Sequence, residues 1–240
     1  MQIKLTLKPE RPLVIPFNYN YQLQSALYAL LGEVNESDFW HDSGFGEYDR
    51  FKGFCFGKLN GRHRADVQAK KISFSDEVRL EVRSPSFEFI DSFQRALEQR
   101  PFLKLYDTRL DVTDASLLNR HLPSGSVKFT AVTPVVIHQT LPDGHTYYFS
   151  PEEDGFYQGV CNNAARKYEA IVGEEPPEIL LRPLGEFKKT VTKYKNFYIT
   201  GYTGSFEFKT ERKAAEFLYN AGLGEKNAQG FGFVEELNEP

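Results

Sequence analysis

Four residues near the start of the chain combine the groups needed for proton transfer beside an anion. His41 precedes a glycine-containing segment at 42–46, and a histidine on a loop is free to reach a ligand. Its reference pKa of ~6.5 suits proton transfer near neutrality. Tyr28 could orient or protonate a reacting oxygen, and Arg50 or Lys52 could stabilise charge that develops in a transition state. Cleavage of a phosphodiester without a metal ion requires groups of these types.

A helical wheel places the ring of Tyr28 away from the apolar stripe of the first predicted helix. The stripe consists of Leu23, Ala26, Leu27, Leu30 and Leu31. Tyr28 lies roughly 130° from the centre of this stripe, and Tyr21 shares its face. We therefore expect Tyr28 to point outward, where it would pack under the loop of His41 or line a cleft. His41 also has a structural alternative, as a surface histidine beside Trp40.

Arg50 and Lys52 are two positions apart, so both side chains would point to the same side of a strand. Residues 33–49, directly before them, contain six acids and no lysine or arginine. Either cation could therefore be held by Glu47 or Asp49 instead of by a ligand. The sequence leaves open which of the two fills the cationic role.

The other histidines are weaker candidates. His63 lies in the segment 61–64, which we expect at a hairpin tip, in contact with phosphate or solvent. His121 falls in a predicted linker, and His138 and His145 flank a turn without a partner motif. No two of these histidines have the spacing of metal ligands. We therefore expect neither a metal site nor a cofactor.

The glycine segment at 222–232 is the most specific string in the sequence. Its four glycines in eleven residues are Gly222, Gly224, Gly230 and Gly232. It matches neither the dinucleotide-binding fingerprint nor a P-loop. Such a segment either offers backbone N–H groups to a phosphate, with Lys226 adding charge, or follows a helix and packs closely between sheets. Close packing is favoured for most of the glycines, and the role of Lys226 stays open.

The order of the predicted elements is the same in the two halves of the chain. In the first half the expected strands and helices lie at 3–7 (strand), 23–31 (helix), 51–59 (strand), 78–82 (strand), 86–100 (helix) and 102–106 (strand). In the second half they lie at 127–137 (strand), 151–172 (helix), 178–191 (strand), 197–209 (strand), 214–221 (helix) and 231–235 (strand). Each half thus has the β-α-β-β-α-β order of a ferredoxin-like unit. We expect an α+β protein with two tandem ferredoxin-like domains, residues 1–122 and 123–240, and a cleft between their sheets.

The composition is that of an ordinary globular protein. The 240 residues are 40% hydrophobic and 26% charged, which excludes a disordered or collagen-like chain. No run approaches ~18 apolar residues, which excludes a membrane span, and the first residues lack the apolar core of a signal peptide. Cys55 and Cys161 are too few for a disulfide scaffold, so we expect a cytoplasmic protein.

Two basic stretches stand out against a formal net charge of −4. Seven basic residues and one acid lie between Arg50 and Lys71, and eight basic residues and three acids lie between Arg182 and Lys213. They could bind a polyanion or could belong to two solvated hairpins. The second stretch contains four lysines on or beside a predicted hairpin, which could reach a single-stranded nucleic acid: Lys188, Lys189, Lys193 and Lys195.

The glycine segment, the length of the chain and the element order resemble those of one family. Two Gly-hydrophobic-Gly triplets, 222–224 and 230–232, flank five residues that include Lys226. This pattern resembles the C-terminal glycine loop of the RAMP-superfamily endoribonucleases that cut CRISPR repeat RNA. The resemblance implies two ferredoxin-like domains, with RNA bound by the glycine segment and by the lysines of the hairpin. Non-catalytic RNA-binding subunits of guide-RNA complexes share the glycine pattern and are the alternative.

The resemblance also implies roles for the N-terminal candidates. The tyrosine of the cutting members falls on Tyr28, the histidine on His41, and the lysine on Arg50 or, with a two-residue slip, on Lys52. The implied reaction is attack of the 2′-OH of the RNA on the neighbouring phosphate, with His41 as base or as acid, leaving a 2′,3′-cyclic phosphate and a 5′-OH end. The implied partners are repeat RNA, single-stranded or in a weak stem-loop, a second copy of the chain, and a guide-RNA effector complex that receives the product. No membrane partner is expected.

Overall fold

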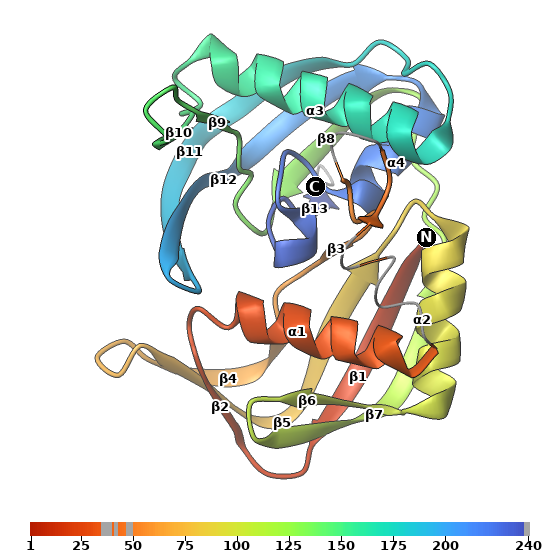
Figure 1. The fold of residues 1–240 in the computed structure, drawn as a ribbon, viewed down its shortest axis with the longest axis vertical. Helices are drawn as coiled ribbons and strands as arrows, with labels where there is room; N and C mark the ends of the chain where they lie inside the picture. Colours follow the sequence, from red (N-terminus) through yellow and green to blue (C-terminus); the bar gives the residue numbers. More distant parts are fainter. Residues whose placement is uncertain (35–39, 41–42, 47–49, 238–240) are drawn as a thin grey trace.

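The computed structural model describes residues 1–34, 40, 43–46 and 50–237 of the chain. It consists of two halves, each with an antiparallel sheet and two long helices packed against it (Figure 1). Each half has its own apolar core. The predicted α+β fold of two ferredoxin-like units is confirmed, with additional strands in both halves. In the described part of the chain, no helix is both long and apolar enough to span a membrane.

The N-terminal half contains a seven-stranded sheet with the central strand order β5-β1-β7. Its strands are β1 (Gln2–Pro9), β2 (Leu13–Pro16), β3 (Cys55–Phe56), β4 (Asn60–Asp66), β5 (Lys71–Arg83), β6 (Phe102–Leu105) and β7 (Thr108–Leu118). Its helices are α1 (Asn20–Leu31), the short η1 (Gly32–Val34) and α2 (Phe87–Gln99). In β1, Ile3, Leu5 and Leu7 are buried while Lys4 is exposed, as the alternation in the sequence predicts. At the start of α2, Ser86 Oγ accepts a hydrogen bond from Phe89 N at 3.2 Å and so caps the helix.

The C-terminal half contains a four-stranded sheet with the order β11-β12-β8-β13 and a separate two-stranded hairpin. Its strands are β8 (Gly125–Ala131), β9 (His138–Thr140), β10 (Thr146–Tyr148), β11 (Leu180–Tyr194), β12 (Phe197–Thr210) and β13 (Val234–Glu236). Its helices are α3 (Asp154–Val172), α4 (Arg212–Ala221) and the short η3 (Asn227–Gln229). The two long strands β11 and β12 form one hairpin whose turn lies at Lys195 and Asn196, as predicted.

Several strand predictions are wrong in detail. The strand expected at 51–59 is restricted to β3, and the chain then continues as β4. His63 consequently lies within β4 and not at a hairpin tip, with its ring 5.7 Å from that of Phe74. The strand that pairs with β1 on the side away from β5 is β7, which follows the strand expected at 102–106. The β4 and β7 sequences are rich in polar residues because most of their side chains are exposed, so their apolar signal is weak.

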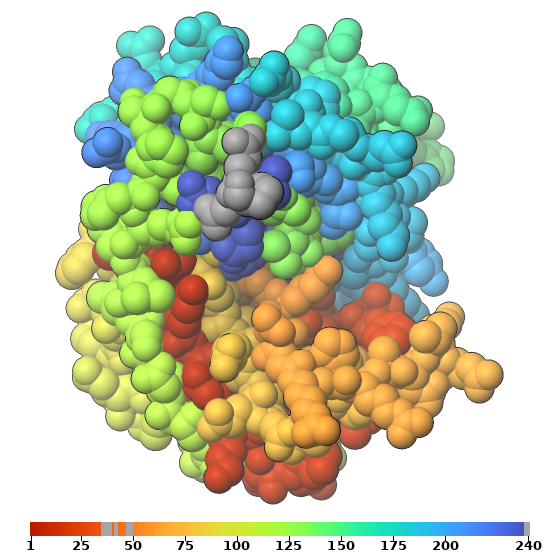
Figure 2. Space-filling model, turned by 180° about the vertical axis from the view of Figure 1, so that it is seen from behind, coloured from red at the N-terminus to blue at the C-terminus, as the bar shows by residue number. Residues whose placement is uncertain are grey.

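Arg83, at the end of β5, joins the two halves. The guanidinium contacts Glu81 Oε1 at 2.5 Å in its own strand and Glu235 Oε1 at 2.6 Å in β13. It also lies over the rings of Tyr219 and Phe233, with Cζ 3.7 and 4.0 Å from their centroids. Seen from behind, the dark blue C-terminal segment lies at the junction between the halves (Figure 2). The segment around β13 of one half is therefore packed against the end of β5 in the other.

Candidate active site

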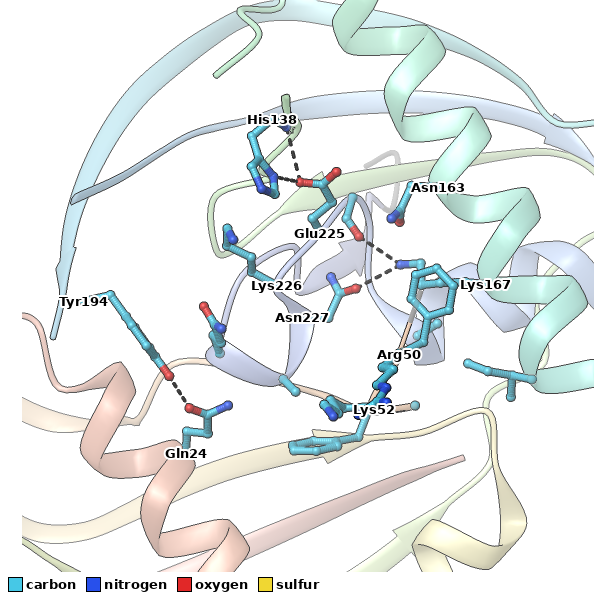
Figure 3. Close-up of a pocket in the computed structure, with 18 of the residues that line it drawn as sticks. Gln24, Arg50, Lys52, His138, Asn163, Lys167, Tyr194, Glu225, Lys226 and Asn227 are labelled. Carbon is cyan, nitrogen blue, oxygen red and sulfur yellow. Dashed lines mark hydrogen bonds and ion pairs between the residues drawn. The ribbon is translucent and has the colours of Figure 1, made fainter. Parts of the chain in front are cut away.

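A cavity of about 530 Å³ lies between the two halves. The N-terminal half contributes residues from α1 and from the segment before β3 (Figure 3). The C-terminal half contributes residues from α3, the β11–β12 hairpin and the glycine segment that follows α4. Its size is in the range of pockets that bind small ligands, about 300–1,000 Å³.

Tyr28 lines this cavity from α1, which is one of the two positions expected for it, but its ring is covered and not exposed. Only 9% of it is exposed. Its hydroxyl donates a hydrogen bond to Trp40 O at 3.3 Å, and its ring packs edge-on against Phe54 with centroids 5.7 Å apart. The segment before β3 covers this side of α1, so the helix is buried on more than one face. Helix periodicity alone could not show this second covering.

Arg50 and Lys52 both line the cavity. They do not belong to a regular strand, because Gly53 with φ +69° interrupts the extended backbone before β3. The two-residue spacing argument therefore does not apply, although both residues border the same space (Figure 3). Glu47 and Asp49, the acids expected to compete for them, lie outside the described residues. The structure brings both cations to the cavity, and the choice between them stays a prediction.

His41 lies outside the described residues, so its proposed role stays a prediction. The residue before it, Trp40, is buried in the N-terminal core. Its ring centroid lies 5.2 Å from that of Phe89 and 5.8 Å from that of Phe45. Trp40 is also the residue whose carbonyl oxygen accepts the hydrogen bond from Tyr28.

The glycine segment is a tightly packed loop. A Cβ atom added to Gly232 would lie 1.9 Å from Leu223 O, and one added to Gly224 would lie 2.6 Å from Val136 O; both glycines have positive φ. Close packing, the structural alternative from the sequence, is therefore observed. The N–H groups of three glycines donate hydrogen bonds within the protein: Gly222, Gly230 and Gly232. Contact between RNA and the glycines stays a prediction. The N–H groups of Gly222, Gly230 and Gly232 are already used within the protein, so a contact at these glycines would not use a free N–H group.

Lys226 lies at the tip of this loop and lines the cavity. Its backbone is left-handed, with φ 60°. Burial lowers the pKa of its ammonium group, and the neighbouring Glu225 carboxylate opposes this shift. Lys226 is thus a cation held in a partly enclosed space, where an anion is attracted more strongly than at an open surface.

Lys167 of α3 is a cavity residue that sequence reasoning missed. It is only 3% exposed, and its Nζ donates hydrogen bonds to Gly222 O at 2.6 Å, Gly224 O at 3.0 Å and Asn227 Oδ1 at 2.9 Å. Figure 3 shows the bond to Asn227. Burial lowers the pKa of Lys167 to about 7. The signal in the sequence is its position one turn after Ala164, on the apolar face of a predicted helix.

His138 and Glu225 form a second pair that the sequence did not indicate. The Glu225 carboxylate contacts His138 Nδ1 and accepts a hydrogen bond from His138 N at 3.2 Å. The imidazole stacks on Tyr148 with centroids 5.9 Å apart. A carboxylate that accepts a hydrogen bond from one ring nitrogen orients an imidazole and leaves the other nitrogen free to accept a proton. The two residues are 87 positions apart, so no local motif could reveal them.

The four lysines of the β11–β12 hairpin are all exposed, and they divide between two sides. Lys195, at the turn, lines the cavity and lies over Tyr21, with Nζ 4.5 Å from the ring centroid. Lys188 borders a second cavity of about 330 Å³ together with Lys58. Burial, and then the charge of Lys188, lower the pKa of Lys58. Lys189 and Lys193 are not among the residues that line either cavity.

Tyr194 ties the hairpin to α1 at one end of the cavity. Its hydroxyl donates a hydrogen bond to Gln24 Oε1 (Figure 3), and its ring packs edge-on against Tyr21 with centroids 5.7 Å apart. Burial raises the pKa of Tyr194. The cavity is therefore bounded by a direct contact between the two halves.

Comparison with known proteins identifies the family. The model of CRISPR-associated protein Cas6, N-terminal, matches residues 14–116, and that of CRISPR associated protein Cas6, C-terminal, matches residues 118–236. The CRISPR-associated endoribonuclease Cas6 1 of Methanocaldococcus jannaschii is 27% identical over 243 residues, which cover 100% of this chain and 94% of that relative.

Solved structures agree with this match. A structure described as a RAMP protein binding different RNA substrates has a TM-score of 0.85 at 22% identity, covering 99% of this chain and 100% of that one. A structure of a CRISPR associated protein Cas6 has a TM-score of 0.82 at 28% identity, covering 99% of both chains. The two matched models together cover nearly all of both halves that frame the cavity, and the chain belongs to the Cas6 family.

Proposed function

We propose that this chain is a metal-independent endoribonuclease that cuts CRISPR precursor RNA within the repeat. One observation carries the proposal: the cavity between the halves brings Tyr28, Arg50 and Lys52 opposite the cations Lys195 and Lys226. A phenol and several cations around one space suit a phosphodiester. The endoribonuclease activity named for the Methanocaldococcus relative supports the same reaction class.

In the proposed reaction, a base takes the proton of a ribose 2′-OH, and the resulting oxygen attacks the adjacent phosphorus. The bond from phosphorus to the 5′-oxygen breaks, and an acid protonates that oxygen. The products are a 2′,3′-cyclic phosphate and a 5′-OH end. His41 acts as the base or the acid, Tyr28 orients or protonates a reacting oxygen, and Arg50 or Lys52 stabilises the pentavalent transition state. Arg50 could stabilise charge but could not act as an acid, because a guanidinium does not lose its proton in proteins.

His138 is a competing candidate for proton transfer, since it lines the same cavity and has a carboxylate partner in Glu225. The two histidines are distinguished by parallel substitutions. We expect His41→Ala to abolish most of the cleavage and His138→Ala to retain it. The reverse result would assign the acid–base role to His138 and would leave the reaction class intact.

The deciding experiment incubates the protein with a cognate repeat RNA in EDTA and resolves the products on a denaturing gel. We expect the wild-type protein to cleave the RNA, His41→Ala to lose cleavage, and the exposed control His145→Ala to keep it. RNA that is retarded on a native gel but never cut would instead identify a non-catalytic RNA-binding subunit. Cleavage that requires added metal would contradict the proposed mechanism.

The proposal extends to how RNA is held and where the protein acts. Lys188 and Lys195 border the two cavities on either side of the glycine segment, so an RNA strand that contacts both would pass along the junction of the halves.

We further infer a division into domains 1–122 and 123–240, a cytoplasmic location, a homodimer, and transfer of the product to a guide-RNA effector complex. Co-purification of the product RNA with the protein or with such a complex tests the last step.

A further inference from the structure

Lys167 has contacts that the proposed mechanism does not use. Its ammonium group donates to three uncharged oxygens, the carbonyls of Gly222 and Gly224 and the side chain of Asn227. These acceptors lie on both sides of Glu225 and Lys226, two of the loop residues that line the cavity. One buried lysine side chain thus holds the glycine segment immediately before and immediately after Glu225 and Lys226.

Asn227 extends this hold to the far end of the segment. While its Oδ1 accepts from Lys167, its Nδ2 donates to Leu223 O at 3.0 Å and to Phe231 O at 3.1 Å. The two arms of the loop are therefore joined through a single amide that Lys167 orients. Removal of the ammonium group would release contacts in both arms at once.

The energetics favour a role for Lys167 beyond filling the core. The neighbouring buried positions of α3 are largely apolar, with Val160, Ala164 and Tyr168 on the inner face. A buried ammonium group is costly even when it is hydrogen-bonded, and an apolar side chain would fill the site at lower cost. An apolar side chain would, however, leave two loop carbonyls without their donor. The lysine is therefore best explained by the loop conformation that it maintains.

We propose that Lys167 is a positioning residue for RNA binding: it holds the glycine segment in the conformation that presents Lys226 to the RNA backbone. The inference rests on the proposed function, since it requires repeat RNA in the cavity. It assigns no chemical step to Lys167 itself. Its effect should therefore appear in RNA affinity and not in the rate of the chemical step.

The test measures the affinity for a repeat RNA with a 2′-deoxy cut site, and separately the single-turnover cleavage rate at saturating intact RNA. We expect Lys167→Met to weaken affinity roughly tenfold and to change the saturated rate by less than about threefold. In a Lys226→Ala background, Lys167→Met should add less than about twofold, because the residue acts through Lys226. Lys104→Met, on the exposed side of β6, is the matched control and should change neither quantity.

The inference would be overturned by unchanged affinity in Lys167→Met, by additive losses in the double variant, or by a reduced rate with unchanged affinity. If Lys167→Met does not fold, Asn227→Leu removes the same link from the loop side and carries the same expectations. Lys226→Ala leaves the contacts of Lys167 in place, and unchanged affinity in this variant alone also overturns the inference. Wild-type protein that does not bind repeat RNA would refute the proposed function. If the wild-type protein cleaves the RNA and the variants bind it with unchanged affinity, only the role of Lys167 is refuted.

Discussion

The two walls of the cavity differ in how their residues come together. The N-terminal wall carries Tyr28, Arg50 and Lys52, which lie within 25 positions of one another in the sequence. The C-terminal wall carries Lys167 from α3, which contacts Gly222 across 55 positions, and His138, which contacts Glu225 across 87 positions. Residues close in sequence can be recognised as a constellation from their types and spacing alone. Residues on the second wall become a site only when the helix, the hairpin and the glycine segment pack together.

The comparison predicts that chemistry belongs to the first wall and RNA placement to the second. The largest expected effect is therefore that of His41→Ala, which should lower the single-turnover cleavage rate by about 10²–10⁴-fold through loss of acid–base catalysis. RNA affinity should stay within about threefold. His145→Ala, an exposed histidine, serves as control. A larger loss of rate in His138→Ala would break the comparison, since chemistry would then lie on the second wall.

The next effect concerns Arg83, which joins the two halves. Arg83→Met should lower the free energy of unfolding by about 3–5 kcal/mol, because Glu81 and Glu235 would lose a buried cationic partner. Chemical denaturation of this variant and of Arg79→Met, an exposed arginine on the same strand, measures the difference. Equal stabilities would show that the halves do not depend on Arg83 for their contact.

A third prediction concerns the second wall alone. Because burial lowers the pKa of Lys167 from 10.5 to about 7, the unfolded chain binds more protons at this group than the folded protein does between these values. Stability contributed by this group should therefore rise with pH across that window, by up to about 1.4 kcal/mol per pH unit. The measurement is the difference in unfolding free energy between wild-type and Lys167→Met protein from pH 7 to pH 10. A difference that falls with rising pH would contradict the assigned direction.

The smallest expected effect tests which lysines of the β11–β12 hairpin contact the RNA. Each lysine that neutralises a phosphate of a single strand contributes roughly −0.7 to the slope of log affinity against log salt. Lys195→Ala should reduce the magnitude of that slope by about this amount, since Lys195 lines the cavity. Lys189→Ala, on the same hairpin but away from both cavities, should change it less. Equal changes would indicate that the hairpin binds RNA along both of its sides.

Some errors of prediction have a common physical cause. The helical wheel places Tyr28 outward because the periodicity of α1 reports only the face that packs on its own sheet. A second layer, formed by the segment that carries Trp40 and Phe54, covers the opposite side. The same segment contains Gly53, whose positive φ shortens the strand expected at 51–59. The hydrophobic pattern of an element shows the face that packs on its own sheet, and it does not show that a further segment covers another face.

For the glycine segment, in contrast to α1, the spacing of residues in the sequence was more informative than hydrophobic periodicity. Its pattern identified the family, and its conformation follows from contacts that tolerate no Cβ atom, such as that between Gly232 and Leu223 O. The role of Lys226 could be suspected from charge alone. Its placement in a cavity depends on Lys167, which lies 59 positions earlier on another helix.

By itself, the sequence determined the class of fold, the repeated order of elements, the family and the residue types of one wall. These properties depend on alternation, helix periodicity and short spacings, which are local. Only the tertiary structure decided that Tyr28 is covered, that Lys167 holds the glycine segment, and that His138 meets Glu225. Those contacts join residues 12 to 87 positions apart within one half or the other. They form only when the elements of each half pack together, and no local pattern in the sequence encodes such a distant partner.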